Sequence, residues 1–114
     1  MKVLVVDDDV DIAESTAMLL DLAGHEARVV LDAALIREQA MEFVPDVVLQ
    51  DVNMPGLTDL RAVVADTRGL VPRAKIFLFT ATPDGIDMVR PNGADGFIAK
   101  PFDFDAMLAT ITPG

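Results

Sequence analysis

Charged and polar side chains follow short apolar runs at four places in the 114-residue chain. In chain order they are Asp7, Asp8 and Asp9, then Asp51, Thr80 and Lys100. Carboxylates that lie together repel one another, and a hard divalent cation with oxygen ligands, such as Mg²⁺, removes that conflict. Beside such a cation one aspartate could attack phosphorus, while the hydroxyl and the ammonium bind phosphoryl oxygens. These residue types therefore predict phosphoryl-transfer chemistry, provided that the fold brings them together.

The apolar runs in front of these residues predict β-strands. Five runs recur along the chain: KVLVV from Lys2, EARVVL from Glu26, DVVLQ from Asp46, KIFLF from Lys75 and GFIA from Gly96. Three of them are nearly continuous, which is typical of parallel strands covered on both faces. The run from Glu26 is the least hydrophobic, which favours a place nearer the sheet edge. Because helical segments separate the runs, the sequence predicts one α/β domain with a five-stranded parallel sheet and right-handed crossovers.

Apolar residues at helical spacing predict the segments between the strands. The stripes are Ile12, Thr16, Leu19, Leu20 and Ala23; Ile36, Ala40, Phe43 and Val44; Leu60, Val63, Val64 and Thr67; and Phe104, Met107, Leu108 and Ile111. The expected N-caps are Asp9 or Asp11 for the first helix, Thr58 for the third and Asp103 for the last. The segment from Thr82 to Gly93 has two prolines and two glycines, so it predicts at most a short helix over Asp84 to Arg90.

Each of the polar residues also has an ordinary structural interpretation. Asp7 and Asp8 could cap a helix or lie in solvent, and Asp51 could form an Asx turn. Thr80 could be structural, and Lys100 could be an exposed lysine. Ligands of open parallel sheets, however, bind outside the carboxyl ends of the strands. Since all of these residues follow strands, their combination favours a site over coincidence.

Composition limits the classes of function. The net charge of −10, from nine basic and nineteen acidic residues, gives no electrostatic attraction to nucleic acid or to an anionic membrane. The chain has no cysteine, which excludes disulfides and thiolate sites. No apolar run approaches the roughly 20 residues that span a bilayer. We expect a single cytoplasmic domain over residues 1–114, with no output domain in this chain.

Four motifs together resemble the receiver domains of two-component response regulators. They are VVDDD at 5–9, DVNMPG at 51–56, FTA at 79–81 and AKPF at 99–102. The resemblance covers essentially the whole chain, and the order and spacing of the motifs make it specific. It implies a flavodoxin-like doubly wound sheet with strand order 2-1-3-4-5, helices on both faces, and a short or irregular fourth helix.

The resemblance assigns chemical roles to the first set of residues. It implies that Asp51 accepts a phosphoryl group from a histidine of a sensor kinase or of a histidine phosphotransfer protein. It also implies that Asp8, Asp51 and the backbone carbonyl of Asn53 bind Mg²⁺ directly, while Asp7 acts through water. Lys100 would contact the phosphoryl group.

A second set of residues would pass on the signal. The resemblance implies that Thr80 swings toward the aspartyl phosphate and that the rotamer of Phe97, at the position of the switch aromatic, follows it. It also implies a cis peptide between Lys100 and Pro101. Downstream partners would then sense a two-state equilibrium shifted by the phosphoryl group.

The chain departs from the family pattern around these motifs. Thr58-Asp59 stands where Asp-Gly is common, Phe97 lacks the hydroxyl of the usual tyrosine, and the fourth and last helices are short. Asn53 and Thr82 only hint at the lifetime of the phosphoryl group. The acceptor chemistry is therefore expected to be intact, whereas the usual signalling face is altered.

Two other functions stay open on the sequence. One is a phosphatase of the haloacid-dehalogenase type, with Asp7 as nucleophile and Asp9 as acid/base; Thr80 and Lys100 would fit that scheme. It leaves the motif at Asp51 unexplained, and no cap insertion follows the first strand. The other is a receiver-like interaction module that is never phosphorylated in service.

Overall fold

The computed structural model describes residues 1–81 and 85–112 as alternating strands and helices. The strands are β1 Lys2–Val6, β2 Glu26–Val30, β3 Val47–Asp51, β4 Lys75–Thr80 and β5 Gly96–Ala99. The helices are α1 Val10–Leu22, α2 Ile36–Phe43, α3 Leu60–Leu70, α4 Gly85–Val89 and α5 Phe104–Ile111, with a short 3₁₀ turn at Ala33–Leu35. All five predicted strands are therefore confirmed within one residue at each end.

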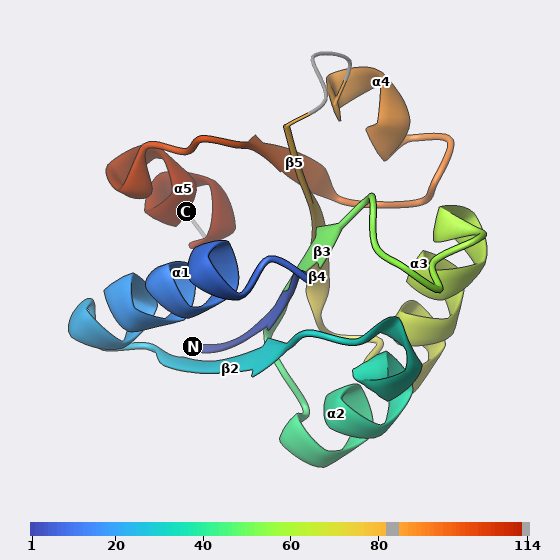
Figure 1. Ribbon diagram of the computed structural model, residues 1–114, viewed down its shortest axis with the longest axis horizontal. Helices are drawn as coiled ribbons and strands as arrows, with labels where there is room; N and C mark the ends of the chain where they lie inside the picture. The colour runs from blue at the N-terminus through green and yellow to red at the C-terminus, as the bar shows by residue number, and fades with distance from the viewer. Residues whose placement is uncertain (82–84, 113–114) are drawn as a thin grey trace.

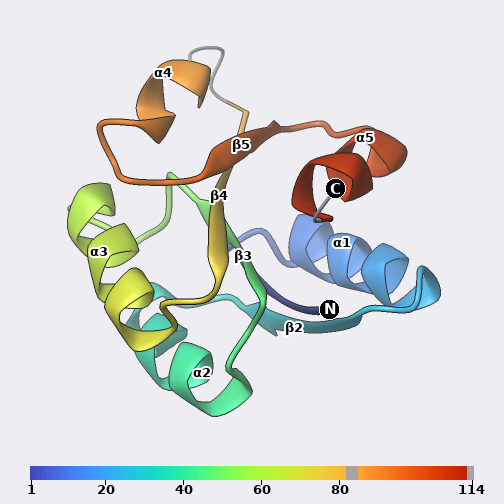
Figure 2. The same ribbon diagram turned by 180° about the vertical axis from the view of Figure 1, so that it is seen from behind.

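The strands form one parallel sheet in the order β2-β1-β3-β4-β5. Helices α1 and α5 cover one face of this sheet, and α2, α3 and α4 lie on the other (Figures 1 and 2). The predicted doubly wound fold is confirmed, and β2 takes the edge position that its lower hydrophobicity favours. Among the described residues, no helix has the length and apolar character needed to cross a bilayer.

The sheet separates two apolar cores. Alternate side chains of each strand point to opposite faces, so Leu4 and Val6 of β1 join the core under α2 and α3, while Val3 and Val5 join the core under α1 and α5. All four are fully buried. Burial on both faces explains why the strands read as continuous apolar runs.

Aspartates begin three of the helices. The side chains of Asp9, Asp59 and Asp103 accept hydrogen bonds from the backbone N–H three residues later, in α1, α3 and α5. The predictions for Asp9 and Asp103 are confirmed, whereas the prediction of Thr58 as the cap of α3 was wrong. Helix α3 begins at Leu60, so Asp59 occupies the capping position and Thr58 lies one residue too early.

The short helix α4 matches the prediction for the fourth segment, although its expected first residue, Asp84, lies outside the described residues, as does Thr82. The chain after α4 is fixed by Asp95, which accepts hydrogen bonds from the Ile76 N–H at 2.8 Å and from Arg68 at 2.9 Å. Partial burial opposes ionisation of Asp95, but these two donors and the charge of Arg68 outweigh it and lower its pKa. These hydrogen bonds therefore connect the start of β5 with α3 and β4.

The sequence predicted that Val44 belongs to the apolar stripe of α2, and this prediction was wrong. Helix α2 ends at Phe43, and Val44 adopts the left-handed conformation with φ 51° and is 60% exposed. Pro45 follows directly, and a steric clash with the proline ring disfavours the helical region for the residue before it. The position therefore terminates the helix, at a cost in strain because a β-branched residue rarely has positive φ.

Replacing Val44 by glycine should stabilise the protein. Glycine adopts positive φ without strain, and the exposed Val44 side chain contributes little burial, so the free energy of unfolding should rise by about 0.5–1 kcal/mol. Urea denaturation of Val44→Gly measures the change. Val10→Gly is the matched control, since Val10 is also exposed but lies in a helix and should not gain. An unchanged or lower stability of Val44→Gly would contradict the strain at this position.

Candidate functional site

The carboxyl edge of the sheet brings together the polar residues that the sequence singled out. β1 leads into Asp7 and Asp8, β3 ends at Asp51, β4 ends at Thr80, and Lys100 follows β5. Because β1, β3, β4 and β5 are successive neighbours in the sheet, these ends lie side by side. They line an open cavity of about 510 Å³ together with Asp9, Ile12, Asn53 and Ala81. The predicted cluster is therefore assembled by the fold.

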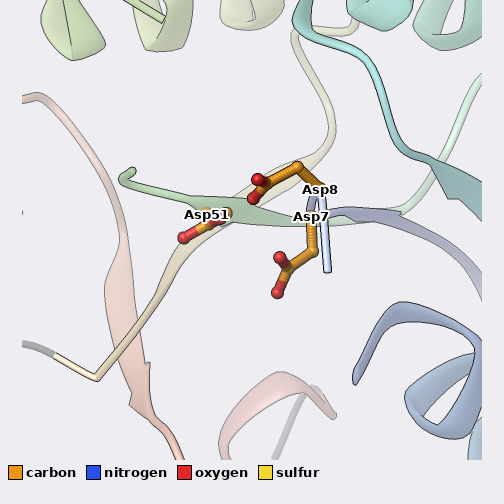
Figure 3. Close-up of side chains that lie close together, drawn as sticks. All are labelled: Asp7, Asp8 and Asp51. Atoms are coloured by element: carbon orange, nitrogen blue, oxygen red, sulfur yellow. The ribbon is translucent and has the colours of Figure 1, made fainter. Parts of the chain in front are cut away.

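Three of the carboxylates that line this cavity, Asp7, Asp8 and Asp51, lie close together (Figure 3). Asp7 and Asp51 are buried, with 1% and 5% of their surface exposed, and Asp8 is exposed. One oxygen from each of the three can be chosen such that all lie within 4.8 Å of one another. Oxygen donors at this spacing suit a hard divalent cation such as Mg²⁺. The donor set therefore fits the predicted metal, with Asp8 offering the side open to solvent.

Lys100 supplies the positive charge of the site. Its ammonium lies 2.5 Å from Asp7 Oδ2 and 3.4 Å from Asp51 Oδ1, and its side chain is only 12% exposed. Lys100 is thus not the ordinary exposed lysine of the alternative interpretation. The peptide between Lys100 and Pro101 is cis, as the family resemblance implied. One ammonium faces two buried carboxylates, which leaves the cluster short of positive charge.

The carboxyl group of Asp51 is harder to ionise than an ordinary aspartate. Burial raises its pKa to about 6, and the charge of Asp7 adds to the rise, although Lys100 and the Asn53 N–H oppose it. The Asn53 N–H donates to Asp51 Oδ1 across 3.3 Å, a long hydrogen bond. The contact places the Asn53 backbone beside the cavity and shows that Asp51 also takes part in the turn, as the alternative interpretation supposed.

Asp9 has a structural task in this arrangement. Its carboxylate accepts from the Ile12 N–H at 3.2 Å and so caps α1, while its own N–H donates to Asp7 Oδ1 at 3.0 Å. The second contact helps to orient Asp7. The cap uses only Oδ1 of Asp9, and the residue also lines the cavity.

Thr80 and Phe97 lie next to each other on the side of α4. Thr80 is buried at the end of β4, and Phe97 is half-buried on β5. A Cβ added to Gly85, the first residue of α4, would lie 2.8 Å from Phe97 Cδ2 and 3.1 Å from Thr80 Cγ2. Both side chains therefore touch the start of α4. The sequence analysis did not single out Gly85, because nothing local to TPDGID shows that a ring approaches it.

Phe79 is a second residue near the site that the sequence analysis did not single out. The Lys100 ammonium lies 4.6 Å from the centroid of its ring. Phe79 stands in the FTA motif, one residue before Thr80, and alternation along the strand predicts only that it points to the opposite face. The path of the chain after β5, which brings Lys100 over the ring, was the missing information.

Comparison with known proteins gives a consistent result. The model of the response regulator receiver domain family matches residues 3–112. The DNA-binding response regulator MtrA of Mycobacterium tuberculosis is 34% identical, over 96% of this chain and 48% of its own length. The transcriptional regulatory protein PrrA of Mycobacterium leprae is 33% identical, with the same two shares. This chain spans about half the length of these curated relatives.

Two solved structures are similar to this chain in both sequence and fold. The chemotaxis protein CheY4 of Vibrio cholerae is 30% identical with a TM-score of 0.83, and the match covers 96% of this chain and 93% of CheY4. A response regulator from Chloroflexus aurantiacus, described as putative, is 29% identical with a TM-score of 0.84 over the same shares. The similarity thus extends over nearly the whole length of these two structures.

The raised pKa of Asp51 predicts a pH-dependent cost in stability. Its folded-state pKa of about 6 exceeds the ordinary value of 3.8, so its stabilising contribution is complete below pH 3.8 and is lost as the pH rises through 6. Metal-free Asp51→Asn does not pay this cost. As the pH is raised from 4 to 7, its free energy of unfolding should therefore rise by about 1–2 kcal/mol relative to that of wild type.

Urea denaturation of both proteins in chelator at each pH measures this difference. The control is Asp66→Asn, which removes a half-exposed carboxylate paired with Arg37 at the surface and should show a much flatter difference. If the two variants follow the same pH dependence, ionisation of Asp51 carries no such cost.

Proposed function

This chain belongs to the response regulator receiver domains, the signalling modules of two-component systems, and we propose that it accepts a phosphoryl group on Asp51. The observation that supports this most is the environment of that carboxylate. Asp51 lines an open cavity, shares a cation-sized space with Asp7 and Asp8, and lies 3.4 Å from the Lys100 ammonium. Negative charge that arrives on a phosphoryl group would meet the Lys100 ammonium and, when it is bound, a divalent cation.

The proposed reaction moves a phosphoryl group between two proteins. A carboxylate oxygen of Asp51 attacks the phosphorus of a phosphohistidine on a sensor kinase or on a histidine phosphotransfer protein. The P–O bond forms as the P–N bond breaks, and the electron pair of that bond returns to the imidazole nitrogen, which takes up a proton. The product is an aspartyl phosphate, a mixed anhydride that water later hydrolyses to aspartate and inorganic phosphate. The chain thereby catalyses only its own modification.

Magnesium, when bound, would neutralise phosphoryl charge and help to position the phosphoryl group against the Asp51 oxygen. We propose Asp8, Asp51 and the backbone carbonyl of Asn53 as its direct ligands, with Asp7 acting through water. This division suits the carboxylates, because Asp8 is exposed while Asp7 is engaged by Lys100 at 2.5 Å. A cation also favours the ionised form of Asp51, and so opposes the raised pKa that would otherwise weaken the nucleophile.

Lys100 and Thr80 would hold the product. The Lys100 ammonium already contacts Asp51 and can pair with a phosphoryl oxygen on that residue. The Thr80 hydroxyl, at the end of the neighbouring strand, would donate a hydrogen bond to another phosphoryl oxygen. These contacts stabilise the charge that phosphoryl transfer concentrates on the equatorial oxygens.

The output would be a change in affinity for a partner protein. Movement of Thr80 toward the phosphoryl group would release its contact at α4 and shift the ring of Phe97, since both side chains touch the start of that helix. The relatives MtrA and PrrA are named a DNA-binding response regulator and a transcriptional regulatory protein. For this chain, with a net charge of −10, we propose a protein partner and no direct contact with nucleic acid.

Phosphorylation can be tested by intact mass after incubation with Mg²⁺ and a small-molecule phosphodonor. Wild type should gain one phosphoryl group, and the gain should disappear when Mg²⁺ is omitted or when Asp51 is replaced in Asp51→Asn. Asp66→Asn is the matched control, because it removes a carboxylate far from the cavity lining, and it should be modified like wild type.

The opposite result would sink the acceptor role. If Mg²⁺ binds but neither the phosphodonor nor a stable phosphoryl analogue such as beryllofluoride modifies or binds wild type, Asp51 is not an acceptor. The chain would then be a receiver-like interaction module. Modification that persists in Asp51→Asn and is lost in Asp7→Asn would instead favour the phosphatase scheme.

A further inference from the structure

The ammonium of Lys100 lies over the face of the Phe79 ring. Lys100 Nζ lies 4.6 Å from the ring centroid, and Phe79 is fully buried on β4. The face of an aromatic ring carries partial negative charge, so a cation within about 6 Å of its centre is attracted to it. The attraction is strongest where water is excluded, and the Lys100 side chain is only 12% exposed.

A second aromatic ring packs against Phe79. Phe102, two residues after Lys100, packs against Phe79 with ring centroids 5.7 Å apart and an interplanar angle of 55°. Phe79 belongs to the core under α1 and α5, and Phe102 packs against that core. The same loop therefore delivers the ammonium to the ring face and a second ring that braces it. Core packing therefore helps to hold the Phe79 ring.

A contact that fixes the ammonium matters because Lys100 lies between two cavities. On one side is the acidic cavity with Asp7 and Asp51. On the other is a groove of about 540 Å³ between α1 and the chain after β5, which Ile12 and Phe102 help to line. A lysine side chain is flexible, and its three donors have no fixed direction. The carboxylates attract the ammonium unequally, at 2.5 Å for Asp7 and 3.4 Å for Asp51.

We propose that Phe79 is a positioning residue, whose ring face keeps the Lys100 ammonium at the point where it contacts both Asp7 and Asp51. The proposal rests on the function proposed for Asp51, because the benefit of this position is that an incoming phosphoryl oxygen finds the ammonium in place. An aliphatic residue of similar size would fill the core but would leave the ammonium without its third contact.

The contact can be tested in the unphosphorylated protein by NMR. An ammonium over a ring face places the neighbouring Lys100 methylene protons in the shielding region, so their signals should lie upfield. Phe79→Leu should abolish this shift. Phe77→Leu is the matched control, since Phe77 is buried on the same strand and in the same core, and it should leave the Lys100 signals in place.

The function of the contact can be tested by the rate of phosphorylation with a small phosphodonor and saturating Mg²⁺. Phe79→Leu should be slower by about 3- to 30-fold, the range that a partly desolvated cation–π contact supports, whereas Phe77→Leu should be close to wild type. Progressive fluorination of the ring at position 79 weakens its negative face with little change in shape. The rate and the upfield shift should then fall together, step by step.

Several results would overturn the proposal. Unmoved Lys100 signals in Phe79→Leu would show that the ring does not hold the ammonium, and equal rate losses in Phe77→Leu would show a purely structural effect. Moved signals with an unchanged rate would show that the position has no benefit. If wild type takes no phosphoryl group, the function proposed for Asp51 fails, and with it the positioning role, while the NMR result still decides whether the contact exists.

Discussion

The site is organised by a shortage of positive charge among carboxylates that the sheet forces together. Asp7 and Asp51 lie at the carboxyl ends of neighbouring strands and are almost completely buried. Among the described residues, Lys100 is the only cation paired with them. Such a cluster is costly in isolation, as the raised pKa of Asp51 indicates. The two apolar cores keep the strand ends in place against this repulsion, so the stability of the fold maintains a cluster that a divalent cation would stabilise.

Strand β4 carries residues that contact the charged site and residues that contact the proposed output surface at α4. Consecutive residues point to opposite faces of the sheet. Phe79 joins the core under α1 and α5 and lies beneath Lys100, whereas Thr80 and Phe97 meet the start of α4 on the other face. Thr80 also lines the cavity of Asp51, so one side chain connects that cavity with the start of α4. A change at Asp51 can reach α4 without any long chain of contacts.

The sequence predicted the parts that depend on periodicity and on strand ends. Continuous apolar runs predicted the parallel strands, and polar residues after those runs, such as Asp51 and Lys100, predicted the cluster. It failed where a detail depends on local backbone conformation, as with Val44, whose position before Pro45 ends α2 one residue early. It also missed contacts such as that of Phe79 with Lys100, because they depend on how a distant loop returns to the sheet.

The affinity for Mg²⁺ tests most directly whether these carboxylates form a cation site. It can be determined by titration for wild type, Asp8→Asn and Asp51→Asn at several pH values. A cluster held together for a cation should bind one Mg²⁺ in wild type, more weakly below pH 6 as Asp51 becomes protonated. Both variants should bind it much more weakly at neutral pH. Equal affinity in all three proteins, or none in wild type, would contradict the view that these carboxylates form a cation site.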